Sequence, residues 1–275
     1  MPPKKVGLVG CGTIGSHLAI AVDSGKVPNA SISSLFDMVE SSAQQLKSQL
    51  QSGPRVCTEF SAFLDSEVDL VVEAASQKAV RELGRSILEA GKDLMIMSVG
   101  ALADEDLLSE LLRIALRKGC RIYIPTGAIA GIDAIRSARH LIESIVLTTT
   151  KNPLALAGAP FFETSDIKLD HITSRTVIYE GPASEAVKAF PANVNVAAVL
   201  GLAGIGVEKT KVRIVADPAA QTNQHEIRAK GSFGEIRISV NNVPSPGNPK
   251  TSFLAVLSAI ECLRSICDDG IRIGS

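Results

Sequence analysis

The fold of this chain is decided by the stretch Val6-Gly7-Leu8-Val9-Gly10-Cys11-Gly12-Thr13-Ile14-Gly15. A short apolar run ends there in a G-x-G-x-x-G pattern and passes directly into a helical pattern, which is typical of the strand, turn and helix that open a βαβ unit. The three glycines permit a tight turn, a close approach of the backbone to a pyrophosphate, and packing of the helix on the strand. Free N–H groups and the positive end of the helix dipole then face the phosphates. The predicted phosphate cradle comprises Gly10, Gly12, Thr13, Ile14 and Gly15.

A second strand, expected at 31–37, ends in Asp37, which lies 27 residues after Gly10. That spacing is near the offset of a carboxylate that binds the ribose hydroxyls of a dinucleotide. A carboxylate there repels a 2′-phosphate, and neither Lys nor Arg follows before Lys47. The sequence therefore favours NAD, with NADP as an alternative. The competing interpretation is that the glycines serve only a turn and Asp37 only a cap.

The composition indicates an ordinary globular protein that binds small molecules. A chain of 275 residues, 45% of them hydrophobic, fits one large or two modest domains. A formal net charge of −1 leaves no excess of Lys and Arg for nucleic-acid binding. The five cysteines form neither a C-x-x-C pair nor a zinc spacing, so we expect free thiols and no metal site. Without a signal-like segment or an apolar run of about 20 residues, the sequence predicts a cytoplasmic protein with no membrane segment.

Alternating strand and helix patterns predict a doubly wound, dinucleotide-binding domain over residues 1–131. Ligands of such sheets lie outside the carboxyl ends of the strands, so the turns there are candidate contacts. The candidates are Ala74, Ala75 and Ser76 after the fourth strand, 98–101 after the fifth and 125–131 after the sixth. Ordinary turns between strand and helix are the alternative for each.

From about residue 132 the pattern changes, and we expect a substrate domain over 132–249. A strand at 143–150 precedes a long loop, 152–170, that could cover an active site. Three later strands, at 211–217, 222–230 and 234–243, are predicted to form an antiparallel set. A final helix within 250–275 is expected to pack back on the first domain. The predicted fold class is α/β, with an N-terminal doubly wound Rossmann domain and a second, mixed α+β domain.

The strand expected at 222–230 carries His225. Its period of two places Asn223, His225, Ile227 and Ala229 on one face and the charged residues on the other. An imidazole near neutrality suits an enzyme that moves a proton beside a hydride. A single histidine on a half-apolar face more often has a structural role, so the pattern alone leaves the role of His225 open.

Several blocks of the sequence resemble the L-aspartate dehydrogenase family. The blocks are 98–102, 127–131, 177–183, 193–198, 216–218, 223–227 and 242–252, in the family's order and across most of the chain. The resemblance implies NAD(P)-dependent oxidation of L-aspartate to iminoaspartate, which hydrolyses to oxaloacetate and ammonia or supplies NAD biosynthesis.

The resemblance also implies site residues. His225 matches the family's catalytic acid/base, while Ala128 and Asn193 match its cofactor contacts, with Ala130 and Asn195 as alternatives. Two substrate carboxylates require donors, for which Arg175, Lys250 and Thr251 are candidates beside Thr173 and Ser174. A homodimer formed through an open sheet face is expected. The alternatives are an oxidoreductase like dihydrodipicolinate reductase or homoserine dehydrogenase, and a non-catalytic NAD-binding sensor.

Overall fold

The computed structural model describes residues 2–191, 194–245, 248–268 and 270, without the side chains of 248–250. The described residues up to Pro125 and from Val256 onward form one compact unit, and Thr126–Ala255 form a second. The expected boundaries at 131 and 249 lie near these divisions, and their independence as folding domains stays a prediction. No helix in the described part of the chain is long and apolar enough to cross a membrane.

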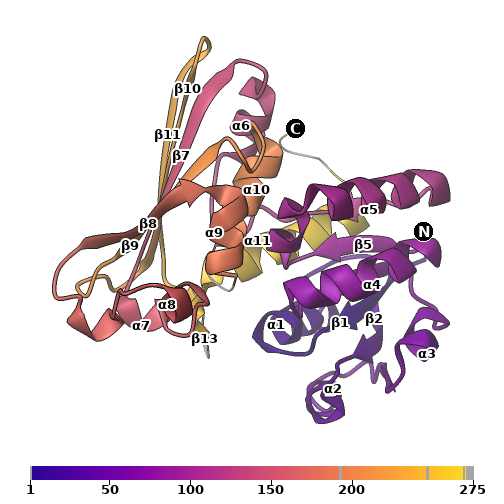
Figure 1. Cartoon of the computed structure of the whole chain (residues 1–275). Coiled ribbons are helices and arrows are strands. Elements are labelled where there is room, and N and C mark those ends of the chain that lie inside the picture. The colour runs from indigo at the N-terminus through magenta and orange to yellow at the C-terminus, as the bar shows by residue number, and fades with distance from the viewer. Residues whose placement is uncertain (1, 192–193, 246–247, 269, 271–275) are drawn as a thin grey trace. The chain divides into compact units, whose positions relative to one another are not determined.

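The first unit is built on a six-stranded parallel sheet in the order β3-β2-β1-β4-β5-β6 (Figure 1). Strands β1 and β4 are neighbours although β2 and β3 separate them in sequence, so the order reverses between them, which is the switch point where such sheets bind ligands. The predicted doubly wound sheet is confirmed. The strands are β1 Lys4–Val9, β2 Ala30–Phe36, β3 Arg55–Cys57, β4 Leu70–Glu73, β5 Asp93–Ile96 and β6 Ile122–Tyr123.

Helices pack on this sheet through apolar faces. They are α1 Thr13–Asp23, α2 Glu40–Lys47, α3 Phe60–Leu64, α4 Gln77–Glu89 and α5 Glu105–Lys118, with a 3₁₀ helix η1 at Val99–Ala103. The last helix, α11 Phe253–Cys267, returns to this unit, because Ala259 and Leu263 lie in the same buried cluster as Leu8, Leu18 and Leu35. Burial of this cluster away from water is the main stabilising contribution to the unit.

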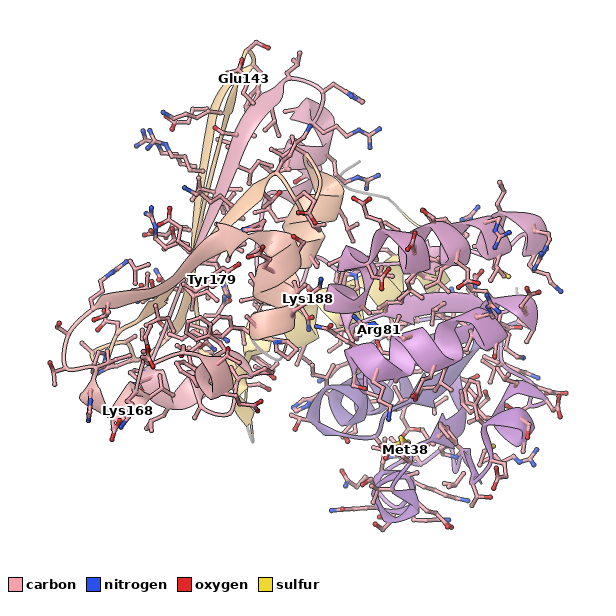
Figure 2. The ribbon with its side chains drawn as sticks, in the orientation of Figure 1. Met38, Arg81, Glu143, Lys168, Tyr179 and Lys188 are labelled. Carbon is pink, nitrogen blue, oxygen red and sulfur yellow. The ribbon has the colours of Figure 1, made fainter. Side chains whose placement is uncertain are left out.

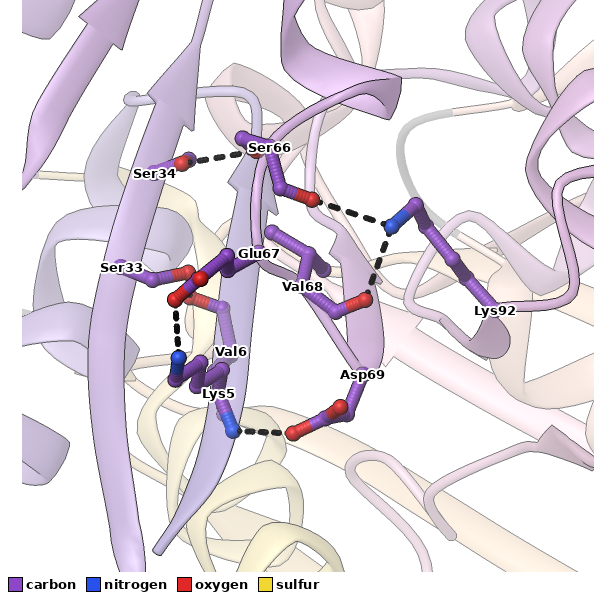
Figure 3. Close-up of polar contacts among 9 residues, drawn as sticks. All are labelled: Lys5, Val6, Ser33, Ser34, Ser66, Glu67, Val68, Asp69 and Lys92. Carbon is purple, nitrogen blue, oxygen red and sulfur yellow. Dashed lines mark hydrogen bonds and ion pairs between the residues drawn. The ribbon is translucent and has the colours of Figure 1, made fainter.

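Polar contacts hold the amino ends of β1 and β4 together (Figure 3). The Lys5 backbone N–H donates to Asp69 at 2.8 Å, and the Lys5 ammonium pairs with Glu67. The Lys92 ammonium donates to the carbonyl oxygens of Ser66, at 3.2 Å, and Val68, at 2.9 Å. These groups tie down the connection before β4 at the end of the sheet opposite the glycine turn, so we interpret them as structural.

The second unit is built on a five-stranded mixed sheet in the order β11-β10-β7-β9-β8. Its strands are β7 Ile142–Lys151, β8 Thr176–Pro182, β9 Thr210–Ala216, β10 Asn223–Gly231 and β11 Gly234–Asn242. Glu143, near the start of β7, lies at the far tip of this sheet (Figure 2). A two-stranded ribbon, β12 Pro244–Ser245 with β13 Asn248–Ser252, follows β11.

The predicted antiparallel set of three strands is wrong. β10 does pair with β11 antiparallel, but β9 pairs parallel with β7 and antiparallel with β8, and β7 lies between β9 and β10. Alternation along a strand shows which residues share a face but not which strand lies beside it. The neighbours of β9 therefore could not be derived from its own pattern.

Helices α6 Ile132–Ala138, α9 Ala183–Ala189 and α10 Asn195–Ala203 lie along one face of this sheet (Figure 1). The segment 152–170, expected as a loop, contains the short helices α7 Pro153–Leu156 and α8 Phe161–Thr164 and begins the 3₁₀ turn η2 Leu169–His171. Phe161 stacks on Phe190, with ring centroids 4.9 Å apart, and meets Tyr179 edge-on. The segment is thus packed against the unit by aromatic contacts that its sequence does not reveal through any period.

Candidate active site

The glycine turn after β1 has the geometry of a phosphate cradle. Gly10 has φ +95°, and a Cβ there would lie 2.7 Å from the Ala74 carbonyl carbon. A Cβ on Gly15 would collide with the carbonyl oxygen of Gly10. A Cβ on Gly12 would meet nothing within 4 Å. Packing therefore explains glycine at positions 10 and 15, whereas the open space at Gly12 fits the close approach of a ligand.

The same turn opens α1 at a helix N-terminus without a side-chain cap. Gly12 is the N-cap residue, and the first helical hydrogen bond runs from the Ser16 N–H to the Gly12 carbonyl at 2.9 Å. The N–H groups of Thr13, Ile14 and Gly15 precede that bond and have no acceptor within the helix. This end of α1 carries the partial positive charge that binds phosphate.

Asp37 connects the end of β2 to the glycine turn. Its two carboxylate oxygens accept from the Cys11 N–H at 2.7 Å and from the Val39 N–H at 2.8 Å. A carboxylate has about four lone-pair positions, so acceptor capacity remains for ribose hydroxyls. Met38, which follows directly, is 86% exposed and adds no charge (Figure 2). Burial and the neighbouring Asp37 raise the pKa of the Cys11 thiol to about 12, so this cysteine is inert.

Glu73, at the end of β4, organises the turns beside the cradle. Its carboxylate is 2% exposed and accepts from the N–H groups of Ala75 at 2.8 Å and Ser76 at 2.9 Å. Ser98, after β5, donates both its N–H at 3.0 Å and its hydroxyl at 2.8 Å. Burial raises the pKa of Glu73, while these four donors act in the opposite direction. Glu73 was not among the predicted site residues, although an acidic residue inside a continuous apolar run is a signal visible in the sequence.

The predicted cofactor contacts Ala74, Ala75 and Ser76 lie in this turn. The Ala74 N–H donates to the Val9 carbonyl at 2.8 Å, which ties the turn to the end of β1. The Ser76 hydroxyl accepts from the Ala79 N–H at 3.1 Å and caps α4. These structural roles leave the cofactor contacts as predictions.

In the second unit, His225 lies in a buried polar cluster at one end of the sheet. It is paired in register with Thr149 of β7, and its Nδ1 is hydrogen-bonded to the Thr149 hydroxyl at 3.0 Å. His225 is 2% exposed. Burial and the nearby positive charge of Lys151 lower the pKa of His225 to about 3, so its ring is neutral at neutral pH. Because the Thr149 hydroxyl engages Nδ1, a further hydrogen bond of the ring would be made through Nε2.

Lys151 and Asn223 lie beside His225 in this cluster, and Asn242 pairs in register with Asn223. Lys151, the last residue of β7, is 2% exposed, and burial lowers its pKa to about 8. The Asn242 amide donates to the Ala128 carbonyl at 2.9 Å and so holds the loop after β6. Among the described residues, the Asn223 amide nitrogen is buried without a hydrogen-bond partner, as is the Ser245 hydroxyl of β12. Buried polar groups left in this way fit a site that a polar ligand completes.

The remaining predicted residues are not all brought to this cluster. Arg175 donates to the Thr150 hydroxyl at 3.4 Å, and Thr150 points to the face of β7 opposite Thr149 by strand alternation. Ala130 is exposed, Thr251 is half-buried in β13, and Asn195 begins α10. Asn193 and the Lys250 side chain lie outside the described residues. Thr149 and Lys151 were not among the predicted site residues, because only the pairing of β7 with β10 brings them to His225.

The described residues contain no group of three or more His, Cys, Asp or Glu side chains that could hold a metal ion. Hydride transfer to a nicotinamide dinucleotide needs no metal ion. The glycine turn after β1 and Asp37 fit a dinucleotide cofactor.

Comparison with known proteins identifies the family. Residues 133–266 match the model for the C-terminal part of aspartate dehydrogenase. The chain is 48% identical to the L-aspartate dehydrogenase of Nitrosopumilus maritimus, over 99% of this chain and 100% of that protein. It is 50% identical to that of Methanosarcina barkeri, over 98% of this chain and 99% of that protein. This chain belongs to the L-aspartate dehydrogenase family.

Membership of the L-aspartate dehydrogenase family agrees with the fold. The crystal structure of aspartate dehydrogenase from Thermotoga maritima is similar, with a TM-score of 0.75 at 30% identity over 98% of this chain and 99% of that chain. Residues 10–125 match the NAD-binding domain model of homoserine dehydrogenase, which implies an NAD(P) cofactor. The predicted family and fold class are thus confirmed, whereas the individual site residues stay predictions.

Proposed function

We propose that this chain oxidises L-aspartate to iminoaspartate with NAD(P) as the hydride acceptor. The observation that carries the proposal is the identity of 48–50% over nearly the whole length of two L-aspartate dehydrogenases. The buried, neutral His225 on the sheet of the second unit supplies a group for the proton chemistry.

Each unit contributes a separate task. The glycine turn, the α1 N-terminus and Asp37 would hold the dinucleotide by its pyrophosphate and ribose. Bound NAD(P) supplies the hydride acceptor. L-Aspartate must lose a proton from its ammonium group before the α-hydrogen leaves as hydride, and His225 is the proposed acceptor through Nε2. Thr149 orients the ring, and orientation is where the protein contributes most to such a reaction.

We further propose a preference for NAD. Asp37 is followed by Met38, Val39 and Glu40, so a 2′-phosphate would meet carboxylates without a compensating cation from this segment. Titration of the protein with NADH and NADPH measures this directly. Equal dissociation constants would contradict the preference.

The first experiment is the rate of NADH formation with L-aspartate at mildly alkaline pH, beside D-aspartate, L-glutamate and L-homoserine. We expect activity with L-aspartate alone and its loss in the His225→Ala variant, which should still bind NADH. L-Homoserine is included because the NAD-binding part matches the homoserine dehydrogenase model. Oxidation of L-homoserine alone, or binding of NADH without turnover of any substrate, would contradict the proposal and favour that alternative or a non-catalytic sensor.

We also propose that the chain forms a homodimer through the outer face of the second sheet. Two further proposals are a cytoplasmic location and a role in supplying NAD biosynthesis. The outer face exposes charges of both signs around a hollow of about 590 Å³. A two-fold interface brings the same surface together from both copies, so side chains of opposite charge on this face could pair across it.

A further inference from the structure

The buried cluster around His225 contains a lysine that the proposed proton transfer does not use. Lys151 ends β7, and strand alternation places its side chain on the same face as Thr149, which bonds His225. Lys151 is 2% exposed, so little water screens the charge of its ammonium group, and an anion that reaches this end of the sheet would interact with it strongly.

The substrate proposed above is a dicarboxylate whose amino group must reach His225. We propose that the Lys151 ammonium binds a carboxylate of the substrate beside His225; this inference rests on the proposed function. A buried cation is the strongest partner for a carboxylate, because the charge-assisted hydrogen bond forms where water is excluded.

The neighbouring strand supplies a second donor. Thr150 of β7 pairs with Gln224 of β10, and one step further along the register Lys151 lies across from Asn223. Alternation places Asn223 on the same face as His225, and its amide nitrogen is buried with no hydrogen-bond partner in the part of the chain that the structure describes. A carboxylate that accepts from both Lys151 and Asn223 would satisfy this donor. The buried, unpartnered amide is an observation independent of the lysine.

The charge of Lys151 also acts on the catalytic histidine. Its positive charge adds to burial in lowering the pKa of His225. A carboxylate bound to Lys151 neutralises that charge, so the pKa of His225 rises and the ring holds a proton more readily. Binding of the substrate thereby prepares the base that receives its proton.

Other charged groups near this end of the sheet are engaged elsewhere. Arg175 bonds Thr150 on the opposite face, and Lys211 and Arg213 pair with Glu180 on the outer face. Asp217 donates its N–H to the Lys151 carbonyl while its carboxylate accepts from the Ala219 N–H. Glu226 and Arg228 point to the outer face of β10, Glu185 and Lys188 are exposed on α9, and α10 carries no charged residue.

Succinate tests the inference without turnover, because it has two carboxylates and no amino group to oxidise. Its affinity is measured by calorimetry with the enzyme saturated with NADH. We expect the wild type to bind succinate at pH 7 and about tenfold more weakly at pH 9.5, where Lys151 is neutral. Lys151→Met should bind about tenfold or more weakly at pH 7 and lose the pH dependence, whereas Lys151→Arg should retain part of the affinity.

The matched control is Lys230→Met, which removes an exposed lysine from the outer face of β10. It should bind succinate as the wild type does. A second readout is the His225 ring signal in NMR, assigned by comparison with His225→Gln. Succinate should raise the pKa of His225 in the wild type, and Lys151→Met should raise it without succinate and remove the response. The NMR spectra also report whether each variant is folded.

The outcomes separate this inference from the proposed function. Undiminished succinate affinity in Lys151→Met overturns the inference, and so does a wild type that does not bind succinate. Retained succinate binding with lost oxidation of L-aspartate in Lys151→Met would assign the lysine to proton transfer and overturn it as well. Lys151-dependent succinate binding in a protein that does not oxidise L-aspartate would support the carboxylate site and contradict the proposed function.

Discussion

Replacement of glycine by alanine should have different effects at two positions of the glycine turn: at Gly12 it should weaken NADH binding, and at Gly15 it should lower stability. Gly12→Ala should fold with an unchanged melting temperature but bind NADH more weakly, because its Cβ enters open space that the pyrophosphate needs. Gly15→Ala should lower the melting temperature, because its Cβ collides with the Gly10 carbonyl. Thermal unfolding and NADH titration of both variants check this. A Gly12→Ala variant with wild-type NADH affinity would place the phosphates elsewhere.

Burial of Lys151 should make the free energy of unfolding depend on pH. Its pKa is lowered from 10.5 to about 8 in the folded state, so the unfolded chain binds the proton more tightly. The free energy of unfolding should therefore be lowest below pH 8 and rise as the pH increases to about 10.5, by up to about 3 kcal/mol. Denaturant unfolding of the cofactor-free protein at both pH values measures the rise.

Because other groups titrate in the same window, the comparison is with variants. Lys151→Met should show a smaller rise than the wild type, and Lys230→Met the same rise as the wild type. Equal rises in all three proteins would mean that the ammonium of Lys151 is better stabilised in the folded state than its burial indicates.

At the scale of the secondary-structure elements, Glu73 joins the turn after β4 to the turn after β5. Glu73→Gln replaces one acceptor oxygen by an NH₂ group that cannot accept from the Ser98 or Ala75 N–H groups. We expect a loss of about 2–4 kcal/mol in the free energy of unfolding, since buried donors lose their acceptor. Denaturant unfolding measures the loss. Glu82→Gln, on the exposed face of α4, is the control and should change stability little.

For the molecule as a whole, the proposed homodimer predicts sensitivity to charge on the outer sheet face. The hollow there is lined by Lys211, Arg213, Arg228 and Arg237, with Glu226 among them. Glu226→Lys replaces the carboxylate that lines the hollow by a further cation, so two copies should repel each other. Light scattering should give a mass near twice 28.9 kDa for the wild type and a shift toward 28.9 kDa for the variant. Glu82→Lys, with the same change of charge on α4, should remain dimeric; a monomeric wild type contradicts the proposal.

Short stretches of sequence were sufficient to predict much of the fold and part of the candidate site. The glycine turn, the acidic end of β2 and the strand that bears His225 are each contained within ten residues or fewer, and each follows from backbone sterics or side-chain period. The parallel sheet of the first unit also follows, because βαβ connections constrain the order of its strands. Exposure at Gly12 and burial at His225 agree with those local expectations.

Contacts between distant residues required the tertiary structure. Thr149 and His225 are 76 positions apart, and Glu73 and Ser98 are 25 apart, so no period relates them. The insertion of β7 between β9 and β10 depends on strand pairing, which side-chain alternation does not encode. That insertion brings Lys151 to His225. The amino-acid pattern thus determined the glycine turn after β1 and the face on which His225 lies, whereas long-range strand pairing decided which charged side chains surround His225.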